Sequence, residues 1–337
     1  MDKASPSSPP VASRTAAVAI GRNEGERLER CLRSLVGRAS PVVYVDSGST
    51  DGSVEFARSL GVEVVALDMS TPFTAARARN EGIARARQLA PALAQVQVLD
   101  GDCELVDGFM AAASHALEQD EKLAVVCGRR REIAPDVSVY NLLCDMEWNT
   151  PVGEANACGG DALIRLAAFD AAGGYDDSLI AGEEPDMCAR MRQKGYRILR
   201  IDHEMTRHDA GMTRIAQWWK RNLRAGHACA EGLHRHPEVA WNHKEVRSNL
   251  AWGLGLPVAA LGLSGVTGGQ SLSVFGLYGV LWYRIRRYRM RTHGDSERAA
   301  GLYASYVVLG KLPQAAGVLQ YRYNKLRGKR AGIIEYK

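Results

Sequence analysis

Residues 15–127 of this chain alternate between short apolar runs and amphipathic segments, and this alternation constrains the fold more than any other feature. Apolar runs of strand type lie at 15–20, 42–45, 62–67, 95–100 and 123–127. Segments with apolar residues at helical spacing lie between them, at 26–36, 54–60, 75–89 and 110–117. Strands that alternate with helices form βαβ units. The sequence therefore predicts an α/β fold with a mixed, mainly parallel sheet and helices on both faces.

Polar clusters follow three of these predicted strands. They are the stretches 22–24 (RNE), 46–51 (DSGSTD) and 100–102 (DGD). Ligands of parallel α/β sheets bind beyond the carboxyl ends of the strands, so we expect these clusters to face one crevice. Two carboxylates one glycine apart suit a hard divalent ion such as Mg²⁺, which binds one or two carboxylates together with phosphate oxygens. Taken alone, the DGD triplet is also compatible with a solvated turn, because Asp and Gly are common in turns.

Other features argue against several classes of protein. No G-x-G-x-x-G follows the first strand and no G-x-x-x-x-G-K-[ST] occurs, which argues against a dinucleotide oxidoreductase and a P-loop NTPase. The seven cysteines are scattered and include no C-x-x-C pair, which favours a reducing compartment over a disulfide framework or a zinc site. Residues 1–14 are rich in Ser, Pro and Ala, and we expect a disordered N-terminus rather than a signal peptide.

The motifs and their order resemble the family 2 glycosyltransferases, which are inverting, nucleotide-sugar-dependent enzymes of the GT-A fold. The stretches that carry the resemblance are 17–24 (AVAIGRNE), 43–53 (VYVDSGSTDGS), 76–82 (ARARNEG), 99–102 (LDGD), 159–165 (GGDALIR), 173–175 (GGY) and 182–186 (GEEPD). They cover roughly residues 15–212 at family-like spacing. The resemblance implies a GT-A catalytic domain over 15–212.

The resemblance also implies roles for residues of a nucleotide site. Glu24 and Asp46 would hold the base and the ribose of a nucleotide-diphosphate sugar. Asp51 would support that pocket, and Arg79 would lie near the base or the diphosphate. The alternative for Arg79 is one member of a solvated, arginine-rich helix face.

A divalent metal, Mg²⁺ or Mn²⁺, is implied as well. Asp100 and Asp102 correspond to the D-x-D motif of the family, which binds the nucleotide and the metal, and we assign Asp102 to the metal. Enzymes of the GT-A fold often use a later histidine as a ligand, and His208 stands at a suitable place in the sequence. An isolated histidine is more often an ordinary surface or core residue, which is the alternative for His208.

The catalytic base is implied by a pair of glutamates. Glu183 and Glu184 stand where the family usually carries Glu-Asp, whose second member is the base, so we expect Glu184 to be the base, with Glu183 and Asp186 as alternates. Asp161 is a further candidate near the donor or acceptor sugar, and Trp148 either stacks on a sugar or belongs to the core. The alternative for the three acids is a first helical turn that favours negative charge.

The C-terminal third differs in composition from the rest. Residues 248–283 carry no charged side chain, and a Gly/Ser-rich stretch divides them into two halves, each shorter than the roughly 20 residues that a spanning helix needs. Residues 284–337 carry a net charge of +10, whereas the rest of the chain carries −5. We expect an amphipathic helical segment at 213–247, an apolar membrane-associated hairpin or span at 248–283, and a basic helical tail at 284–337. A buried helical pair in an accessory domain is the alternative.

These observations predict an inverting glycosyltransferase that acts on a lipid-linked or polysaccharide acceptor. Basic residues on both sides of 248–283 favour the cytoplasmic face of the inner (plasma) membrane, with an anionic membrane surface as a partner. No nucleic acid is expected, because the basic tail contains no recognisable binding module. Two other functions stay open, a sugar-phosphate nucleotidyltransferase and a non-catalytic membrane scaffold. The first usually has a basic, Gly-rich loop after its first strand, and residues 21–25 (GRNEG) are shorter and more acidic.

Overall fold

The computed structural model describes residues 14–329 and residue 332, and the chain divides into two compact units. Unit 1 comprises the described residues up to Ile133, Glu147–Leu179 and Glu183–Ala210, and unit 2 comprises Ala134–Met146, Ile180–Gly182 and the described residues from Gly211 onward. The predicted disordered segment 1–14 lies outside the described residues, apart from Arg14.

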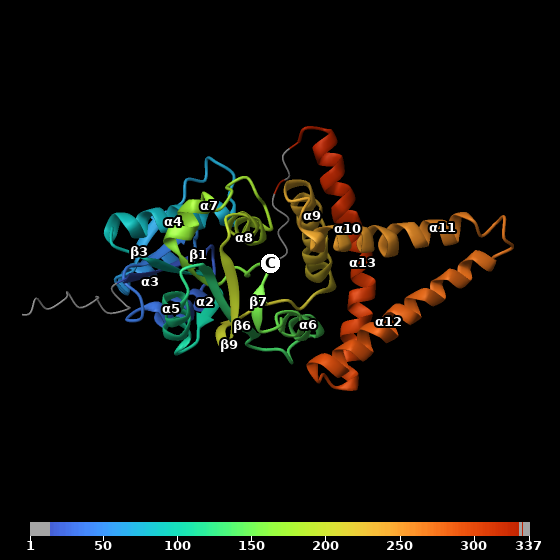
Figure 1. The fold of residues 1–337 in the computed structure, drawn as a ribbon, viewed down its shortest axis with the longest axis horizontal. Helices are drawn as coiled ribbons and strands as arrows, with labels where there is room; N and C mark the ends of the chain where they lie inside the picture. Colours follow the sequence, from blue (N-terminus) through green and yellow to red (C-terminus); the bar gives the residue numbers. More distant parts are fainter. Residues whose placement is uncertain (1–13, 330–331, 333–337) are drawn as a thin grey trace, which may run out of the picture. The chain divides into compact units, whose positions relative to one another are not determined.

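Within the described residues, unit 1 is built on one nine-stranded sheet, seen edge-on among the helices in Figure 1. The strand order is β3-β2-β1-β4-β8-β6-β9-β5, and β7 pairs with β9. Six strands run in one direction, whereas β5, β7 and β8 run in the other, so the predicted mixed, mainly parallel sheet is confirmed. The strands are β1 Thr15–Gly21, β2 Val42–Asp46, β3 Glu63–Ala66, β4 Gln95–Asp100, β5 Cys103–Leu105, β6 Leu123–Glu132, β7 Gly153–Ala155, β8 Ala162–Arg165 and β9 Arg197–His208.

Helices cover both faces of the sheet because the chain reverses its direction of travel after β3. The connections β1-α2-β2 and β2-α3-β3 move outward, and α4 returns the chain to β4 across the opposite face. The helix α4 packs closely there, since a Cβ at Gly82 would stand 2.4 Å from Val18 Cγ1 and 2.8 Å from Val45 Cγ2. The helices of unit 1 are α2 Glu26–Leu35, α3 Ser53–Ser59, α4 Ala75–Leu89, α5 Phe109–Gln119, α7 Leu166–Ala172 and α8 Glu183–Gln193.

The register of the central strands brings their carboxyl ends to one edge. Gly21 is paired with Asp46 and Ile20 with Asp100, so the loops after β1, β2 and β4 leave the sheet side by side. The strands β6 and β9 run parallel to each other and end in the same direction. The clusters at 22–24, 46–51 and 100–102 therefore share an edge, as the sequence predicted.

Four strands were not predicted from the sequence, namely β5, β7, β8 and β9. Three of them have only three or four residues, which is too short for a periodic signal. The strand β9 has twelve residues, but charged and apolar side chains do not alternate regularly along it. Its pairing with β5, β6 and β7 thus overrides a weak local pattern.

Unit 2 is helical in its described residues. Its elements are α6 Val139–Glu147 (up to Met146), α9 Ile215–Arg235, α10 Ala240–Leu250, the π-helix η1 Ala251–Gly255, α11 Leu256–Gly262, the 3₁₀-helix η2 Gln270–Phe275, α12 Gly276–Tyr288, the π-helix η3 Arg289–His293 and α13 Glu297–Leu326. The helix α13 continues through Pro313 to Leu326. Glycines set its packing on α9, since a Cβ at Gly226 would stand 2.0 Å from the carbonyl oxygen of Gln314.

The predicted apolar hairpin has a defined shape within unit 2. The elements α11, η2 and α12 run from the body of unit 2 to a common tip and back, as Figure 1 shows in orange. None of the helices within residues 14–329 is both long enough and apolar enough to cross a membrane.

Candidate active site

The loops after β1 and β2 are tied together by hydrogen bonds. Asn23, which has a positive φ of 56°, accepts a hydrogen bond from the Thr50 amide at 2.7 Å. Asp51 accepts one from the Gly25 amide at 3.0 Å and one from the Ser53 hydroxyl at 2.6 Å. Burial alone would raise the pKa of the Asp51 carboxyl, but its hydrogen bonds with Ser53 and Gly25 together outweigh burial and lower that pKa. Asp51 thus supports the two loops, and its predicted support of a nucleotide pocket remains a prediction.

Glu24 and Asp46 lie at the same edge. Asp46 is buried and accepts hydrogen bonds from the Tyr44 hydroxyl and from the Gly48 amide, each at 3.0 Å. Glu24 lies over the start of the DGD turn, since a Cβ at Gly101 would stand 3.4 Å from Glu24 Cγ. The structure places both acids at one edge of the sheet, and their predicted contacts with a base and a ribose remain predictions.

The centre of the edge is a group of four side chains, Arg79, Asp100, Glu183 and Glu184, which we call the Arg79 cluster and of which Arg79 and Glu183 are buried. The guanidinium of Arg79, on α4, lies 2.7 Å from Asp100 Oδ1, 2.8 Å from Glu183 Oε1 and 3.0 Å from Glu184 Oε1. Only 2% of the Arg79 side chain is exposed. Burial opposes its charge, but the carboxylates of Asp100, Glu184 and Glu183 outweigh burial and raise the pKa of Arg79 above its usual value. The guanidinium of Arg79 thus binds Asp100, which is 21 residues away in the sequence, and Glu183, which is 104 residues away.

Glu184 has the properties of a proton acceptor. Burial, with a further contribution from Glu183, raises the pKa of Glu184 to about 7, while Arg79 opposes the rise. A carboxylate whose pKa lies near neutrality is matched to general base catalysis. The alternate Asp186 lies outside the cluster, because its carboxylate is held by Arg190 at 2.7 Å on the next turn of α8.

Asp102 and His208 form a second buried pair beside the cluster. His208 Nε2 lies 3.2 Å from Asp102 Oδ1, and β5 and β9 bring the two together because Cys103 is paired with His208. Burial, with the nearby charge of Arg130, lowers the pKa of His208 to about 4, so the imidazole is neutral at pH 7. Neutral imidazole is the form that binds metals. Burial raises the pKa of the Cys103 thiol, which therefore stays protonated and is a poor ligand.

Asp161 connects the Arg79 cluster with the pair of Asp102 and His208. Its carboxylate accepts a hydrogen bond from the Thr206 hydroxyl at 2.6 Å and one from the Asp100 amide at 3.3 Å. It also lies 2.9 Å from the guanidinium of Arg130. The structure thus brings seven predicted residues into one neighbourhood, and these are Arg79, Asp100, Asp102, Asp161, Glu183, Glu184 and His208.

Arg130 belongs to the site but was not predicted from the sequence. Its guanidinium stands 5.5 Å from the centre of the Trp148 ring, and the Trp148 ring meets the His208 ring edge-on at 4.7 Å. Trp148 therefore lies at the site rather than in a remote part of the core. The predicted strand ended at residue 127, whereas β6 continues to Glu132 with register shifts on both sides of Arg129, so no sequence pattern placed Arg130 at this edge.

The donor set fits a divalent cation. Asp100, Asp102, Asp161, Glu183 and Glu184 bring five carboxyl groups, whereas Arg79 and Arg130 bring only two permanent positive charges. Carboxylate oxygen and neutral imidazole nitrogen are both ligands of first-row divalent metals. The Nδ1 atom of His208 is buried and has no hydrogen-bond partner among the described residues. The polar contact of this ring is therefore made by its other nitrogen, Nε2, with the carboxylate of Asp102. Asp102 and His208 are therefore the residues that would hold the ion.

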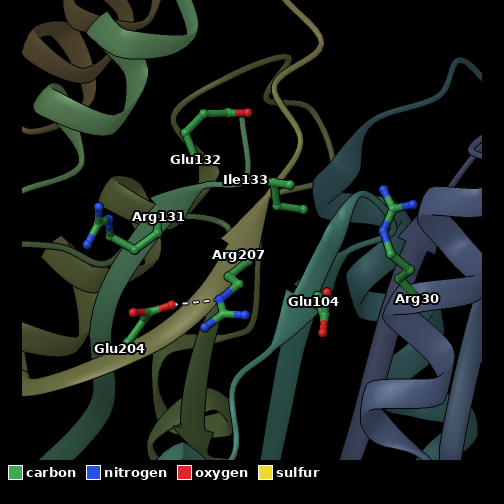
Figure 2. A pocket seen from close by; sticks show the side chains of 7 residues that line it. All are labelled: Arg30, Glu104, Arg131, Glu132, Ile133, Glu204 and Arg207. Atoms are coloured by element: carbon green, nitrogen blue, oxygen red, sulfur yellow. Dashed lines mark hydrogen bonds and ion pairs between the residues drawn. The ribbon is translucent and has the colours of Figure 1, made fainter. Parts of the chain in front are cut away.

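A separate pocket lies on the other face of the β5–β9 pair, because successive residues of a strand point to opposite faces. Its volume is about 380 Å³, and Figure 2 shows Glu204 and Arg207, both on β9, joined by an ion pair of 2.9 Å. The lining residues are Arg30, Glu104, Arg131, Glu132, Ile133, Glu204 and Arg207. Three basic and three acidic side chains balance each other, so this pocket favours no particular charge in a ligand.

Comparisons with known proteins agree with this geometry. Residues 18–157 match the model of the family described as "Glycosyl transferase family 2". The chain is 28% identical over 193 residues to the succinoglycan biosynthesis protein ExoA of Rhizobium meliloti (strain 1021), which covers 53% of this chain and 58% of the relative. It is 25% identical over 217 residues to the O-antigen chain rhamnosyltransferase WbaN of Salmonella anatum, and the match covers 58% of this chain and 65% of the relative. The chain thus spans less than two thirds of either relative.

A solved structure resembles the chain over nearly its whole length. The mannosyltransferase PcManGT from Pyrobaculum calidifontis, in complex with GDP-Man and Mn²⁺, has a TM-score of 0.63 at 18% sequence identity. The match covers 93% of this chain and 88% of that one. At this identity the likeness concerns the fold, and it confirms the predicted GT-A architecture with a helical C-terminal region.

Proposed function

Because residues 18–157 place this chain in glycosyl transferase family 2, we propose that it transfers a sugar from a nucleotide-diphosphate sugar to an acceptor hydroxyl with inversion at the anomeric carbon. The observation that carries this proposal is the position of Glu184 in the Arg79 cluster, next to the Asp102–His208 pair. One site thus holds a proton acceptor and a place for a diphosphate. These are the two needs of an inverting transfer.

The base in this proposal is Glu184. With a pKa near 7, it is largely ionised at slightly alkaline pH and takes the proton of the acceptor hydroxyl as the oxygen attacks the anomeric carbon. Glu183 is 4% exposed and lies 2.8 Å from Arg79, which suits a residue that orients the guanidinium. Asp186 is engaged by Arg190 and is the weakest of the three candidates.

The departing diphosphate is stabilised by positive charge. A divalent ion held by Asp102 and His208 supplies this charge when it is bound. Asp100 orients Arg79 toward the same edge, and Arg130 is a second guanidinium within the site. Mg²⁺ and Mn²⁺ both accept carboxylate ligands, and the imidazole of His208 favours Mn²⁺ over Mg²⁺.

The acceptor in this proposal is a hydroxyl of a lipid-linked or polysaccharide glycan. The support comes from the relatives, whose names describe succinoglycan biosynthesis and an O-antigen chain rhamnosyltransferase. Trp148, a half-buried aromatic side chain next to His208, suits a site for a sugar ring, because sugars stack on aromatic side chains through their apolar faces.

Turnover of a panel of nucleotide sugars with Mn²⁺ tests the proposal. We expect release of nucleoside diphosphate from the correct donor, and release of pyrophosphate would instead identify a nucleotidyltransferase. Glu184→Gln should lower kcat by about 10²–10⁴-fold, the usual contribution of a general base. Asp186→Asn is the matched control on the same helical turn and should leave kcat within a few-fold of the native value. Undiminished turnover by Glu184→Gln would refute the assignment of the base.

Metal binding is tested separately by thermal unfolding. A ligand that binds only the native state raises its apparent stability. We expect Mn²⁺ together with the nucleoside diphosphate to raise Tm of the native protein and not of Asp102→Ala. An equal rise in both would show that Asp102 does not hold the ion.

A further inference from the structure

The hairpin of unit 2, which we define as residues 254–280, exposes apolar side chains on both of its arms. Val258 and Leu261 on α11 are 59% and 61% exposed, and Leu277 and Val280 on α12 are 45% and 56% exposed. Val266 at the tip is 88% exposed. Ala260 is the one buried residue of this stretch, so the hairpin has no core of its own. An apolar surface of this extent, uninterrupted by charge, marks a site of interaction.

Three hydroxyl groups near the tip donate hydrogen bonds to backbone carbonyls within the hairpin itself. Ser264 donates to the Leu261 carbonyl at 2.6 Å, Thr267 to the Leu263 carbonyl at 2.8 Å, and Ser271 to the Ala260 carbonyl at 2.6 Å. Side chains that bond their own backbone need no water. Internal satisfaction of polar groups is the condition that a hydrocarbon environment imposes on a polypeptide.

The two ends of the hairpin, which together form its base, are flanked by charged side chains. Lys244 and Arg247 are exposed before the first arm, and Arg284, Arg287 and Arg291 are exposed at the end of the second. Aromatic side chains accompany them, among which Trp241 and Tyr283 are 53% and 51% exposed. Basic residues next to Trp and Tyr are typical of the boundary between lipid headgroups and hydrocarbon.

The base is also where the hairpin is fixed to the rest of unit 2. A Cβ at Gly253 would stand 1.9 Å from the carbonyl oxygen of Lys311, and Trp282 Nε1 donates to the Ser305 hydroxyl at 3.0 Å. The apolar part beyond these contacts therefore projects from a firm attachment to α13.

The length of the arms limits how far the hairpin reaches. From Leu254 to Leu263 the chain rises roughly 14 Å at about 1.5 Å per residue. The hydrocarbon core of a bilayer is about 30 Å thick, so the hairpin reaches through about one leaflet. This agrees with the finding that no helix of the described residues can span a membrane.

We propose that the hairpin 254–280 inserts into one leaflet of an anionic lipid bilayer, with its tip at Val266 in the hydrocarbon and its basic base among the headgroups. Lipid is favoured over a protein partner because both arms and the tip are exposed, whereas a protein would cover one face. Five exposed basic residues at the base complement anionic headgroups. This proposal does not depend on the transfer reaction, so its test can fail while the proposed function stands.

The first experiment measures binding of the full chain to phosphatidylcholine vesicles that contain about one third phosphatidylglycerol. We expect binding that persists in about 0.5 M NaCl, because salt screens the headgroup charges but not apolar insertion. The double variant Val258→Glu with Leu261→Glu should lower the partition coefficient more than tenfold. Val152→Glu, an exposed apolar position of unit 1, is the matched control and should bind like the native chain.

The second experiment reports the surroundings of the tip. An environment-sensitive nitrobenzoxadiazole dye on Val266→Cys should shift to shorter wavelength when vesicles are added, whereas the same dye on Val152→Cys should not. Binding that disappears in salt and ignores the double variant would overturn insertion and leave surface attraction alone. A blue shift that appears without lipid and grows with protein concentration would also overturn it and assign the hairpin to a second copy of the chain.

Discussion

The Arg79 cluster of unit 1 and the hairpin 254–280 of unit 2 are both exceptions to the rule that apolar side chains are buried and charged ones exposed, and they break it in opposite ways. The cluster holds charged groups inside the protein, where Arg79 is 2% exposed and meets three carboxylates. The hairpin holds apolar groups outside, where Val266 is 88% exposed. A buried charge costs free energy unless it is paired, and an exposed apolar surface costs free energy unless it is covered.

The two regions differ in where the compensation comes from. The partners of Arg79 are supplied by the chain itself, from the end of β4 and the start of α8. The hairpin finds no such cover within unit 2, where only Ala260 of the whole stretch is buried. Substitutions in the cluster should therefore change the stability of the isolated protein, whereas substitutions in the hairpin should change only what it binds.

The largest effect on stability is expected from Arg79→Leu. Removal of the guanidinium leaves its carboxylate partners without their cation, and breaking a buried ion pair from one side costs about 3–5 kcal/mol. Urea unfolding at pH 8, followed by circular dichroism, should show a loss of this size. The loss should shrink at pH 5, where Glu184 takes up a proton.

Arg87→Leu is the control for this prediction because it removes an arginine from the same helix. Arg87 pairs with Asp170 at 2.7 Å, and the Asp170 side chain is 56% exposed. A surface pair of this kind contributes about 0–1 kcal/mol. Equal losses in the two variants would mean that burial of the Arg79 cluster does not matter for stability.

A smaller effect is expected from pH, and it sharpens the description of the cluster. The base must be ionised, so kcat should rise about tenfold per pH unit below the pKa of Glu184, near 7, and level off above it. The native carboxyl binds a proton more readily than the unfolded one. The free energy of unfolding should therefore fall as pH rises from about 4.5 to 7, and Glu184→Gln should remove this decline.

The pH profile of Asp186→Asn discriminates between Glu184 and Asp186 as the base. In this variant, kcat should rise with pH over the same range as in the native protein, because Asp186 is held by Arg190 rather than by the Arg79 cluster. If the acid limb of the kcat profile instead shifts in Asp186→Asn and keeps its native position in Glu184→Gln, then Asp186 is the base and Glu184 is not.

The sequence predicted the edge of the site better than its interior. The alternation of strands and helices implied that Asp46 and Asp100 lie at the same edge of the sheet, and the register confirms this, because β2 and β4 flank β1 on its two sides. Arg79 was assigned to a base or a diphosphate, but its three carboxylate partners stand on distant segments. No local pattern encodes such a contact, because it exists only after α4 and α8 pack on the sheet.

Arg130 was missed for a related reason. A single arginine near the end of a strand has no periodic signal, and β8, whose antiparallel course places Asp161 beside Asp100, was too short to predict. The pair Asp102 and His208 was predicted through a resemblance in sequence order. The pairing of β5 with β9 supplies the physical cause, which the spacing of 106 residues alone could not.

The smallest effect is expected from Val266→Gln in the absence of lipid. The side chain at this position is almost wholly exposed, so it gains little apolar burial on folding, and surface substitutions usually change stability by less than about 0.5 kcal/mol. Urea unfolding of the lipid-free protein measures this change. Val318→Gln is the matched control, because Val318 is a fully buried valine of α13 and should cost several times more. A large loss in Val266→Gln would mean that another part of the protein covers the tip in solution, and the contrast between a self-sufficient cluster and an uncovered hairpin would no longer hold.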